Sequence, residues 1–352
     1  MDENENWISL TTSNIHGLSV THESKQSTVS RAVLSPVLKT DYIQRGYRKP
    51  YKPKRYYIHS LFELHNETLN VWTHLIATLV FVYKFIQTTE YVNYIDDVNS
   101  LPVLVFSIGT IVSTLFSAVA HLMHSRSEYH HFKYFQIDYF GVNLNAHGVG
   151  MIYMFFSGTE LFYDHWGAYF VPWTLAMTSF AGVVAMGLGK MYLRRLRIVI
   201  NITQNLTSCL LLGMPLWYKL ADVISTNDIA AFWNDVFPCL THYILFGISA
   251  LFYATKIPER FKPELFDLIG HSHQWFHLFI SLMSLSQFHT IELLYSRRSA
   301  ALTSLAQPTV YNTILPHCVL FVLSVTFIYT TTRITKSRAR NEYHSFNTFK
   351  QQ

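Results

Sequence analysis

Two histidines four positions apart, His273 and His277, interrupt an otherwise apolar stretch of the sequence. On a helix, residues at this spacing lie on one face about one turn apart, so both imidazoles can reach the same metal ion. His121, one turn after Ser117, can supply a third nitrogen. Three protein ligands with a water molecule are typical of an open, catalytic zinc site, because structural sites are closed by a fourth protein ligand. We therefore predict that His121, His273 and His277 bind zinc.

Two further residues suggest how such a metal would be used. Asp138 is predicted to orient the bound water or to accept its proton, since zinc lowers the pKa of bound water to about 7. Ser117 is expected to form a hydrogen bond at the edge of the site. Imidazole ligands without a thiolate also suit copper, iron or nickel, so the residue types alone leave the metal open. A His-x-x-x-His pair taken by itself is mostly coincidental, and the prediction depends on His121 and Asp138 lying at the same depth.

The composition indicates that these residues lie on segments embedded in a lipid bilayer. Half of the 352 residues are hydrophobic and only 14% are charged, whereas soluble domains have roughly 25% charged residues. The net charge of +5 is small and scattered, while nucleic-acid binding would require a basic stripe with stacking aromatics. Nucleic acid is therefore excluded as a partner. The three cysteines lie in apolar stretches without CxxC spacing, so neither disulfides nor a thiolate metal site is predicted.

Eight apolar stretches are long enough to cross the hydrocarbon core, which takes about 20 residues. They lie approximately at 69–87, 101–123, 139–157, 169–189, 198–218, 236–254, 273–291 and 313–332. The third and seventh are the least apolar, because asparagines and histidines interrupt them, and such polar groups usually face a bundle interior. We predict an all-α polytopic membrane bundle over 42–333, with a seven-helix core and one C-terminal helix. Residues 1–41 are predicted to be a disordered cytoplasmic tail, and 334–352 a cytoplasmic C-terminal tail.

The orientation of the bundle follows from its basic residues, because positively charged loops stay in the cytoplasm. They are Arg45, Arg48, Lys49, Lys52, Lys54 and Arg55 before the first span, Arg126 and Lys133 in the second loop, Lys190, Arg194, Arg195 and Arg197 in the fourth, Lys256, Arg260 and Lys262 in the sixth, and Arg333, Lys336, Arg338 and Arg340 after the last span. Both termini are therefore predicted to be cytoplasmic. The second span then ends at Ser117 and His121, the third begins at Asp138 and the seventh begins at His273. All of these residues are placed at one membrane depth near the cytoplasmic surface.

Other histidines receive less specific interpretations. His124 is an alternative ligand, but we interpret it as a loop residue at the aqueous boundary. His130 and His131 are interpreted as ordinary loop histidines. His147 and His242 are placed deeper or on the opposite side, where hydrogen bonding between helices is expected.

A polar cluster precedes the first span and continues one turn into it. It comprises His65, Asn66, Glu67, Thr68, Asn70, Thr73 and His74. The favoured interpretation is helix capping, in which Thr68 or Asn66 caps the helix and Glu67 lies at its positive end. The alternative is that these residues contact the metal ligands and orient them.

Three segments resemble the signatures of the progestin and adipoQ receptor family. They are His65–His74, Ser117–His121 followed by Ile137-Asp138-Tyr139, and Gly270–His277. The resemblance runs from about Tyr42 to Arg333 and extends to the related haemolysin-III-like proteins and alkaline ceramidases. It implies that His121, His273 and His277 bind zinc and that Asp138 holds a water molecule. The eighth span and the segment Tyr42–Arg48 are more similar to the membrane progestin receptors, whereas Ser272-His273-Gln274 is closer to the adiponectin receptors.

The resemblance implies a receptor, and we expect it in the plasma membrane. A steroid or sphingolipid ligand would enter the bundle from the membrane lipids and shift an equilibrium that a G protein or another cytoplasmic effector detects. The residues themselves favour a second hypothesis, zinc-dependent hydrolysis of a lipid amide as in the alkaline ceramidases, with Asp138 transferring the proton and Ser117 beside it. A third hypothesis is that zinc only ties three helices together. The expected function is a receptor with latent or ligand-stimulated lipid hydrolysis.

Overall fold

The computed structural model describes residues 28–157, 167–193, 195–298 and 307–350. In this part of the chain the structure is almost entirely helical, which confirms the predicted all-α class. The α-helices are α1 (Lys54–His59), α2 (Thr68–Thr88), α3 (Ser100–Met123), α4 (Glu128–Ile152), α6 (Gly167–Tyr192), α7 (Arg197–Leu212), α8 (Met214–Thr226), α9 (Ile229–Ala231), α10 (Phe237–Thr255), α11 (Ser272–Arg298) and α12 (Leu315–Lys350). Short 3-10 helices occupy Arg31–Val33, Ser60–Phe62 and His124–Arg126, and π-helical turns occupy Tyr153–Ser157, Phe232–Val236 and Val310–Ile314. Two short strands, β1 (Thr28–Val29) and β2 (Tyr47–Arg48), pair antiparallel.

Within the described residues, five helical segments are long and apolar enough to cross a membrane. They are Thr68–Thr88, Ser100–Arg126, Phe170–Tyr192, Ile229–Thr255 and Val310–Ser337. A sixth results if α7 and α8, which meet at an angle of 56°, form one span. The helices α4 and α11 are not in this group, and they contain the two predicted spans that polar residues interrupt. The chain is therefore a multi-pass membrane protein, while the count of eight spans stays a prediction.

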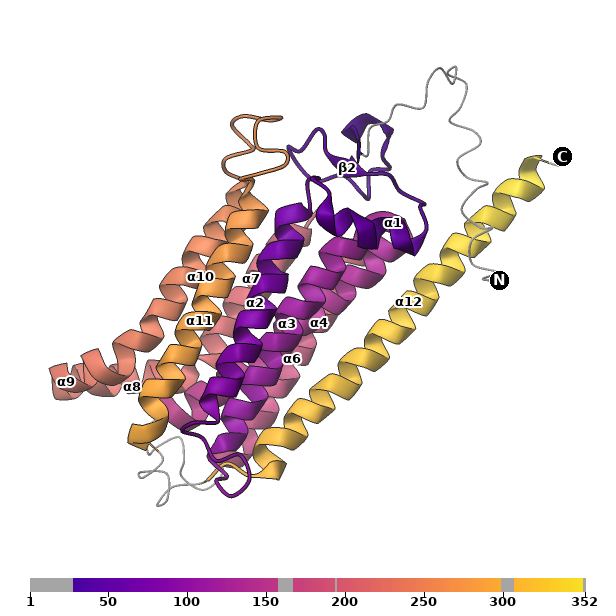
Figure 1. Cartoon of the computed structure of the whole chain (residues 1–352). Coiled ribbons are helices and arrows are strands. Elements are labelled where there is room, and N and C mark those ends of the chain that lie inside the picture. The colour runs from indigo at the N-terminus through magenta and orange to yellow at the C-terminus, as the bar shows by residue number, and fades with distance from the viewer. Residues whose placement is uncertain (1–27, 158–166, 194, 299–306, 351–352) are drawn as a thin grey trace.

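The long helices lie side by side in one bundle, and the two polar helices lie among the apolar ones (Figure 1). Helix α4 packs against α3, α6, α7 and α12, while α11 packs between α10 and α2. Helix α12 runs along α4 and α6 at the edge of the bundle and continues past the predicted end of the last span at residue 332 (Figure 1). The contacts made by α4 explain why its polar residues are mostly buried.

The close packing of α3 against α4 depends on glycine. A Cβ atom on Gly148 would lie 2.7 Å from the Cα of Phe106, and one on Gly141 would lie 2.9 Å from the Cα of Ser113. Real Cβ atoms do not approach a backbone this closely, so only glycine permits the observed separation. This close approach brings the end of α3 next to the start of α4, where Ser117, His121 and Asp138 are located.

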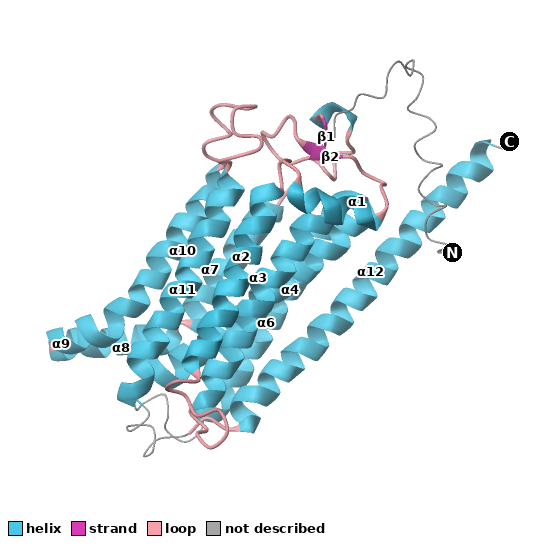
Figure 2. Ribbon diagram, in the orientation of Figure 1, coloured by secondary structure: helices cyan, strands magenta, loops and turns pink. Residues whose placement is uncertain are grey.

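The segment before α1 is folded against one end of the bundle, together with the connection between α10 and α11 (Figure 2). The side chains of Leu34, Leu38, Ile43 and Tyr47 form a small buried apolar cluster. The carboxylate of Asp267 accepts hydrogen bonds from the backbone N–H groups of Gln44 and Arg45 at 3.1 and 2.9 Å. The predicted tail 1–41 is therefore wrong for residues 28–41, because a few spaced apolar residues in a polar segment are enough to dock it. Residues 1–27 lie outside the described part of the chain.

Candidate metal centre

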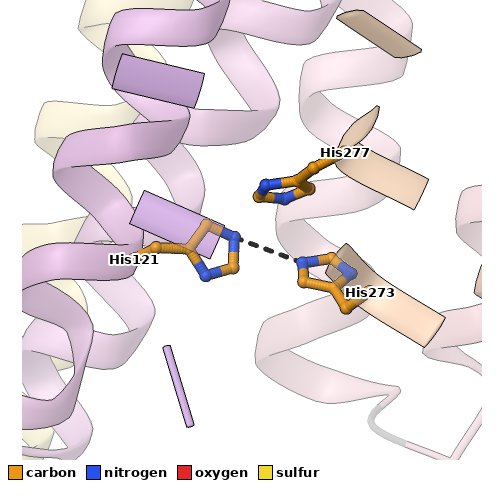
Figure 3. Close-up of side chains that lie close together, drawn as sticks. All are labelled: His121, His273 and His277. Atoms are coloured by element: carbon orange, nitrogen blue, oxygen red, sulfur yellow. Dashed lines mark hydrogen bonds between the residues drawn. The ribbon is translucent and has the colours of Figure 1, made fainter. Parts of the chain in front are cut away.

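The three histidines predicted as metal ligands lie together at one end of the bundle. His121 is in the last turn of α3, and His273 and His277 are in the first two turns of α11 (Figure 3). One ring nitrogen from each lies within 4.8 Å of the other two, and the Nε2 atoms of His121 and His273 are 3.2 Å apart. His121 and His277 are buried and His273 is half-buried. Helices far apart in the sequence thus bring three imidazoles to one point.

The distance between the Nε2 atoms of His121 and His273 fits a tetrahedral metal ion, and the nitrogen of His277 lies within 4.8 Å of both residues' ligand atoms. Zinc–nitrogen bonds of 2.0–2.1 Å at tetrahedral angles place two ligand nitrogens about 3.3–3.4 Å apart. The observed separation of 3.2 Å between His121 and His273 is close to this value. Within the described residues, the group contains no fourth histidine, cysteine or carboxylate. The arrangement therefore offers three protein ligands and leaves one position for water or another ligand.

Hydrogen bonds behind the rings orient two of the three histidines. The Nδ1 of His121 is 2.8 Å from a carboxylate oxygen of Glu67, and the Nδ1 of His277 is 3.1 Å from the backbone carbonyl oxygen of Asn70. Both partners are acceptors, so each Nδ1 carries the proton and donates it. The Nε2 lone pairs are then free to bind a metal. Such partners fix the ring orientation and raise the basicity of a ligand histidine.

Glu67 supports the metal ligands and does not cap α2 with its side chain. It occupies the N-cap position, yet no side-chain capping bond forms there, and its carboxylate is buried. The carboxylate accepts hydrogen bonds from Asn70 Nδ2 at 2.7 Å and from His121, and lies 3.3 Å from Nε2 of His124. Burial alone would raise the pKa of Glu67, but the hydrogen bonds from His121 and His124 outweigh burial and hold the pKa well below its usual range. Glu67 does lie at the N-terminal end of α2, as predicted, and its carboxylate also contacts a candidate metal ligand. The prediction that Thr68 or Asn66 caps the helix is wrong, because Glu67 occupies the N-cap position.

The predicted loop histidines are also placed differently. His124 is buried and belongs to a second group of metal-binding character, formed with Glu67 and His121. Its Nδ1 lies 3.1 Å from Nδ1 of His131, which is buried. His131 and the half-buried His130 both lie in the first turn of α4. The expectation of an aqueous loop was wrong because α4 begins directly after a single 3-10 turn.

Arg48 binds the C-terminal end of α3. From the sequence it was counted only among the cytoplasmic positive charges. The side chain of Arg48 is 2% exposed. Its guanidinium donates to the backbone carbonyls of His121 and Leu122, each at 2.6 Å, and to Ser125 Oγ at 3.0 Å. The last carbonyls of a helix lack partners within the helix and carry partial negative charge, so a cation there is stabilising. Arg48 thus fixes the turn that carries His121, a contact that no local motif indicated.

Asp138 and Ser117 lie together beside the histidines without joining them. Both side chains are buried. Ser117 is within hydrogen-bonding reach of the Asp138 carboxylate, which also interacts electrostatically with His121 and Lys190. The structure therefore brings all five predicted site residues into one region, with three as candidate ligands and two as neighbours.

Hydrogen bonds between helices account for the two remaining histidines, as predicted. The Nδ1 atoms of His147 on α4 and His317 on α12 lie 3.0 Å apart. His242 on α10 contacts the hydroxyl of Tyr153 at 2.8 Å and that of Thr290 on α11 at 3.0 Å. The interpretation of these two residues is confirmed.

These features define a class of protein. It is a multi-pass helical membrane protein with a buried histidine group at one end of the bundle. Residues 62–288 match the family model described as haemolysin-III related. The chain is 30% identical to membrane progestin receptor beta of Homo sapiens and of Sus scrofa, with 77% of each chain covered. It is 29% identical to membrane progestin receptor alpha of Homo sapiens over 77% of this chain and 78% of that protein. The chain belongs to the haemolysin-III-related family, and its resemblance to the progestin and adipoQ receptors is confirmed.

Proposed function

We propose that this protein is a membrane progestin receptor-like protein that binds a steroid or another lipid within the bilayer and signals to a cytoplasmic partner. The observation that carries the proposal is the buried three-histidine group, supported by Glu67 and Asn70, in a chain similar to proteins named membrane progestin receptors. The partner would be a G protein or another effector, and the membrane would be the plasma membrane. Both assignments come from the family resemblance of the sequence motifs.

The proposed topology has eight spans and cytoplasmic termini. Helices α4 and α11, at 25 and 27 residues, are long enough to cross, and both pack among the apolar helices. Polar residues are tolerated in a span where other helices bury them. The end of α12 and the folded segment around β2 lie toward the same end of the bundle (Figure 1), as an even number of spans requires. The distribution of Lys and Arg places that end in the cytoplasm.

Zinc is the metal that we assign to the centre. His121, His273 and His277 would hold it, since imidazole nitrogens are common zinc ligands and the 3.2 Å between the Nε2 atoms of His121 and His273 suits tetrahedral zinc. A bound zinc ion would supply Lewis-acid chemistry toward water and toward a carbonyl group. Asp138, buried beside His121, would hold a water molecule or take a proton from it, while Ser117 keeps the carboxylate in place.

A second candidate function, hydrolysis of a lipid amide such as a ceramide, is favoured by the Asp138–Ser117 pair. A zinc ion that only joined helices would need no carboxylate beside it. In hydrolysis, water adds to the carbonyl carbon, the carbon–nitrogen bond breaks, and the leaving amine takes a proton that Asp138 can transfer. This activity would be latent or ligand-stimulated in a receptor.

The test uses purified protein whose zinc content is quantified. Binding of labelled progesterone and release of sphingosine from labelled ceramide are measured for the wild type and the Asp138→Asn and His273→Ala variants. We expect one zinc per chain, saturable lipid binding, and loss of zinc from the His273→Ala variant. A protein without zinc, or one that binds neither lipid, would refute the proposal.

The same experiment separates the two candidate functions. If Asp138→Asn keeps its zinc and its fold but stops sphingosine release, the chain is an enzyme. If no release occurs while zinc and steroid binding persist, it is a receptor whose zinc is structural. If His273→Ala loses signalling only through loss of folded protein, the structural role of zinc is supported further.

A further inference from the structure

A cleft lies at the end of the bundle where the folded N-terminal segment meets α7 and α10. Its volume is about 470 Å³, which is within the range of small-molecule sites. Arg31 and Asp41 line it from the N-terminal segment, Ile198 from the start of α7, and Lys256 and Arg260 from the residues that follow α10. None of the three candidate metal ligands lines this cleft. Three cations and one carboxylate thus surround a space that is separate from the metal centre.

The protein does not balance the positive charge of the cleft. Among the described residues, none of the three cations forms an ion pair. Glu259 interacts electrostatically with Lys256, but its buried carboxylate already accepts hydrogen bonds from the backbone N–H and the hydroxyl of Ser272. Burial and the charge of Arg197 lower the pKa of Lys256 to about 8, and Glu259 and Asp41 oppose this only in part. An anion bound in the cleft would relieve the repulsion between these cations.

The hydrogen-bond donors at the cleft are held in place. Nη1 of Arg31 donates to the backbone carbonyls of Thr40 and Ile43, which leaves Nε and Nη2, two adjacent nitrogens that together can bind a phosphate. At the start of α7, the N-cap residue Leu196 makes no side-chain capping bond, and the first turn has no acidic residue. The first N–H groups of a helix lack partners within the helix and carry partial positive charge, so they attract anions. Ile198 lies in this turn and lines the cleft.

The position of the cleft indicates that a lipid supplies the anion. Ala254 and Thr255 line the cleft, and they are the last residues of the apolar segment Ile229–Thr255. Ala254 is exposed, and Leu251, one turn earlier on the same helix face, is 59% exposed. Acyl chains can lie along this apolar surface while the headgroup occupies the charged cleft. Basic pockets at the cytoplasmic ends of membrane helices bind phosphorylated headgroups in this way.

We propose that the cleft binds the phosphorylated headgroup of a lipid in the cytoplasmic leaflet, with Arg31, Lys256 and Arg260 contacting the phosphate. The inference goes beyond the proposed function, because this lipid is neither the ligand nor a substrate at the histidine group. The choice of leaflet follows from the proposed topology. A phosphate monoester carries a charge of about −1.5 to −2, which suits three cations opposed by the carboxylate of Asp41. A lipid held here joins the N-terminal segment to α7 and α10.

The experiment measures binding of three probes to the full-length protein in an uncharged detergent at low salt. Short-chain phosphatidylinositol monophosphate carries the monoester, short-chain phosphatidylinositol lacks it, and inositol bisphosphate is the phosphorylated headgroup without acyl chains. We expect the monophosphate lipid to bind at least about tenfold more tightly than either of the other probes. One charge-assisted hydrogen bond is sufficient for a difference of this size.

Single substitutions test the assigned contacts. Lys256→Gln and Arg260→Gln should each lower the affinity for the monophosphate lipid by roughly tenfold, the effect of one lost charge-assisted hydrogen bond. Asp41→Asn should raise this affinity severalfold, because it removes the carboxylate that lines the cleft. Lys262→Gln is the matched control, since Lys262 is an exposed cation two residues from Arg260 that does not line the cleft. It should bind the lipid as the wild type does.

A second variant protects the test against loss of the fold. The ammonium group of Lys256 also lies over the ring of Tyr253, 4.4 Å from its centroid, so Lys256→Gln can disturb the packing. Arg260 is exposed, and its variant should unfold at the wild-type temperature. A loss of lipid affinity in Arg260→Gln with unchanged thermal unfolding therefore reports on the cleft itself.

Each outcome supports or overturns the inference. Equal binding of the two inositol lipids overturns the requirement for a phosphate monoester. If inositol bisphosphate binds as tightly as the monophosphate lipid, the occupant is a soluble phosphate and the lipid assignment is overturned. If Lys262→Gln loses as much affinity as Arg260→Gln, or if no probe binds, the cleft is not the site. None of these results depends on whether the protein binds a steroid or a ceramide.

Discussion

Replacing Glu67 by glutamine should weaken zinc binding while leaving the fold intact. The two residues have the same shape, and a glutamine carbonyl oxygen can still accept the hydrogen bonds from His121 and Asn70, which both reach Oε2, at 2.8 and 2.7 Å. The amide nitrogen would face His124, whose Nε2 lies 3.3 Å from Oε1. The substitution therefore removes the negative charge and keeps the hydrogen-bond geometry.

The expected loss follows from that charge. A hydrogen bond to a charged group contributes about 1.5–3 kcal/mol and a neutral one about 0.5–1.5 kcal/mol. The difference of about 1–2 kcal/mol for the His121 contact corresponds to a zinc affinity lower by roughly five- to thirtyfold. Glu67→Ala also loses the orientation of the ring, and its affinity should fall toward the hundredfold effect that partners behind metal ligands can reach.

Competition against a chromogenic zinc chelator, with the protein in detergent micelles, measures this affinity directly. Glu63→Gln is the matched control, because Glu63 lies four residues earlier with an exposed side chain. It should bind zinc as the wild type does. If Glu67→Gln also stays within twofold of the wild type, Glu67 does not tune the metal centre. A loss of thermal stability without a loss of zinc affinity would show that Glu67 supports the fold and not the metal ligands.

Three other predictions concern stability, measured as thermal unfolding in one detergent. Gly148→Ala should destabilise the protein by about 1–3 kcal/mol through overpacking against α3. The control Gly247→Ala should be neutral or stabilising, because its new Cβ meets nothing within 4 Å. Equal effects of the two substitutions would refute the packing argument. Arg48→Ala leaves the carbonyls of His121 and Leu122 unpaired and should cost about 1–3 kcal/mol for each; a wild-type unfolding temperature would contradict this. Stripping zinc with a chelator should lower the unfolding temperature reversibly, since zinc at a hundred times its Kd contributes about 2.7 kcal/mol, and an unchanged temperature would show that the histidines hold no metal.

The helices could be predicted from the sequence because a bilayer imposes a simple rule. Each of the eight predicted stretches coincides with a helix or, at 198–218, with the bent pair α7 and α8. The stretches in α4 and α11 are the least apolar of the eight, and these two helices are not among the segments that are apolar enough to be candidate spans. The rule also gave no warning that residues 28–41 are folded, since this depends on spaced side chains such as Leu34 and Leu38, which pack with Ile43 and Tyr47.

The candidate ligands were accessible to sequence reasoning for a related reason. The predicted orientation and membrane depth place His121, Asp138 and the pair His273 and His277 at one level. In a small helical bundle, side chains at one level that point inward lie close together. The depth of a residue in the membrane does not determine, however, whether its side chain points into the bundle or into water. His124 and His131 were assigned to water because the loop between the second and third spans is short and polar, whereas the structure buries them.

By itself, the sequence determined the helical class, the approximate ends of the helices and the three histidines that could share a metal ion, because hydrophobic length and residue spacing are local properties. Only the tertiary structure decided which other side chains contact those histidines and the helix ends that carry them. Glu67 faces His121, Arg48 holds the end of α3, and the ring of His74 stacks on that of His277. These contacts join residues far apart in the chain, and the packing of whole helices determines them, so no local pattern could reveal them.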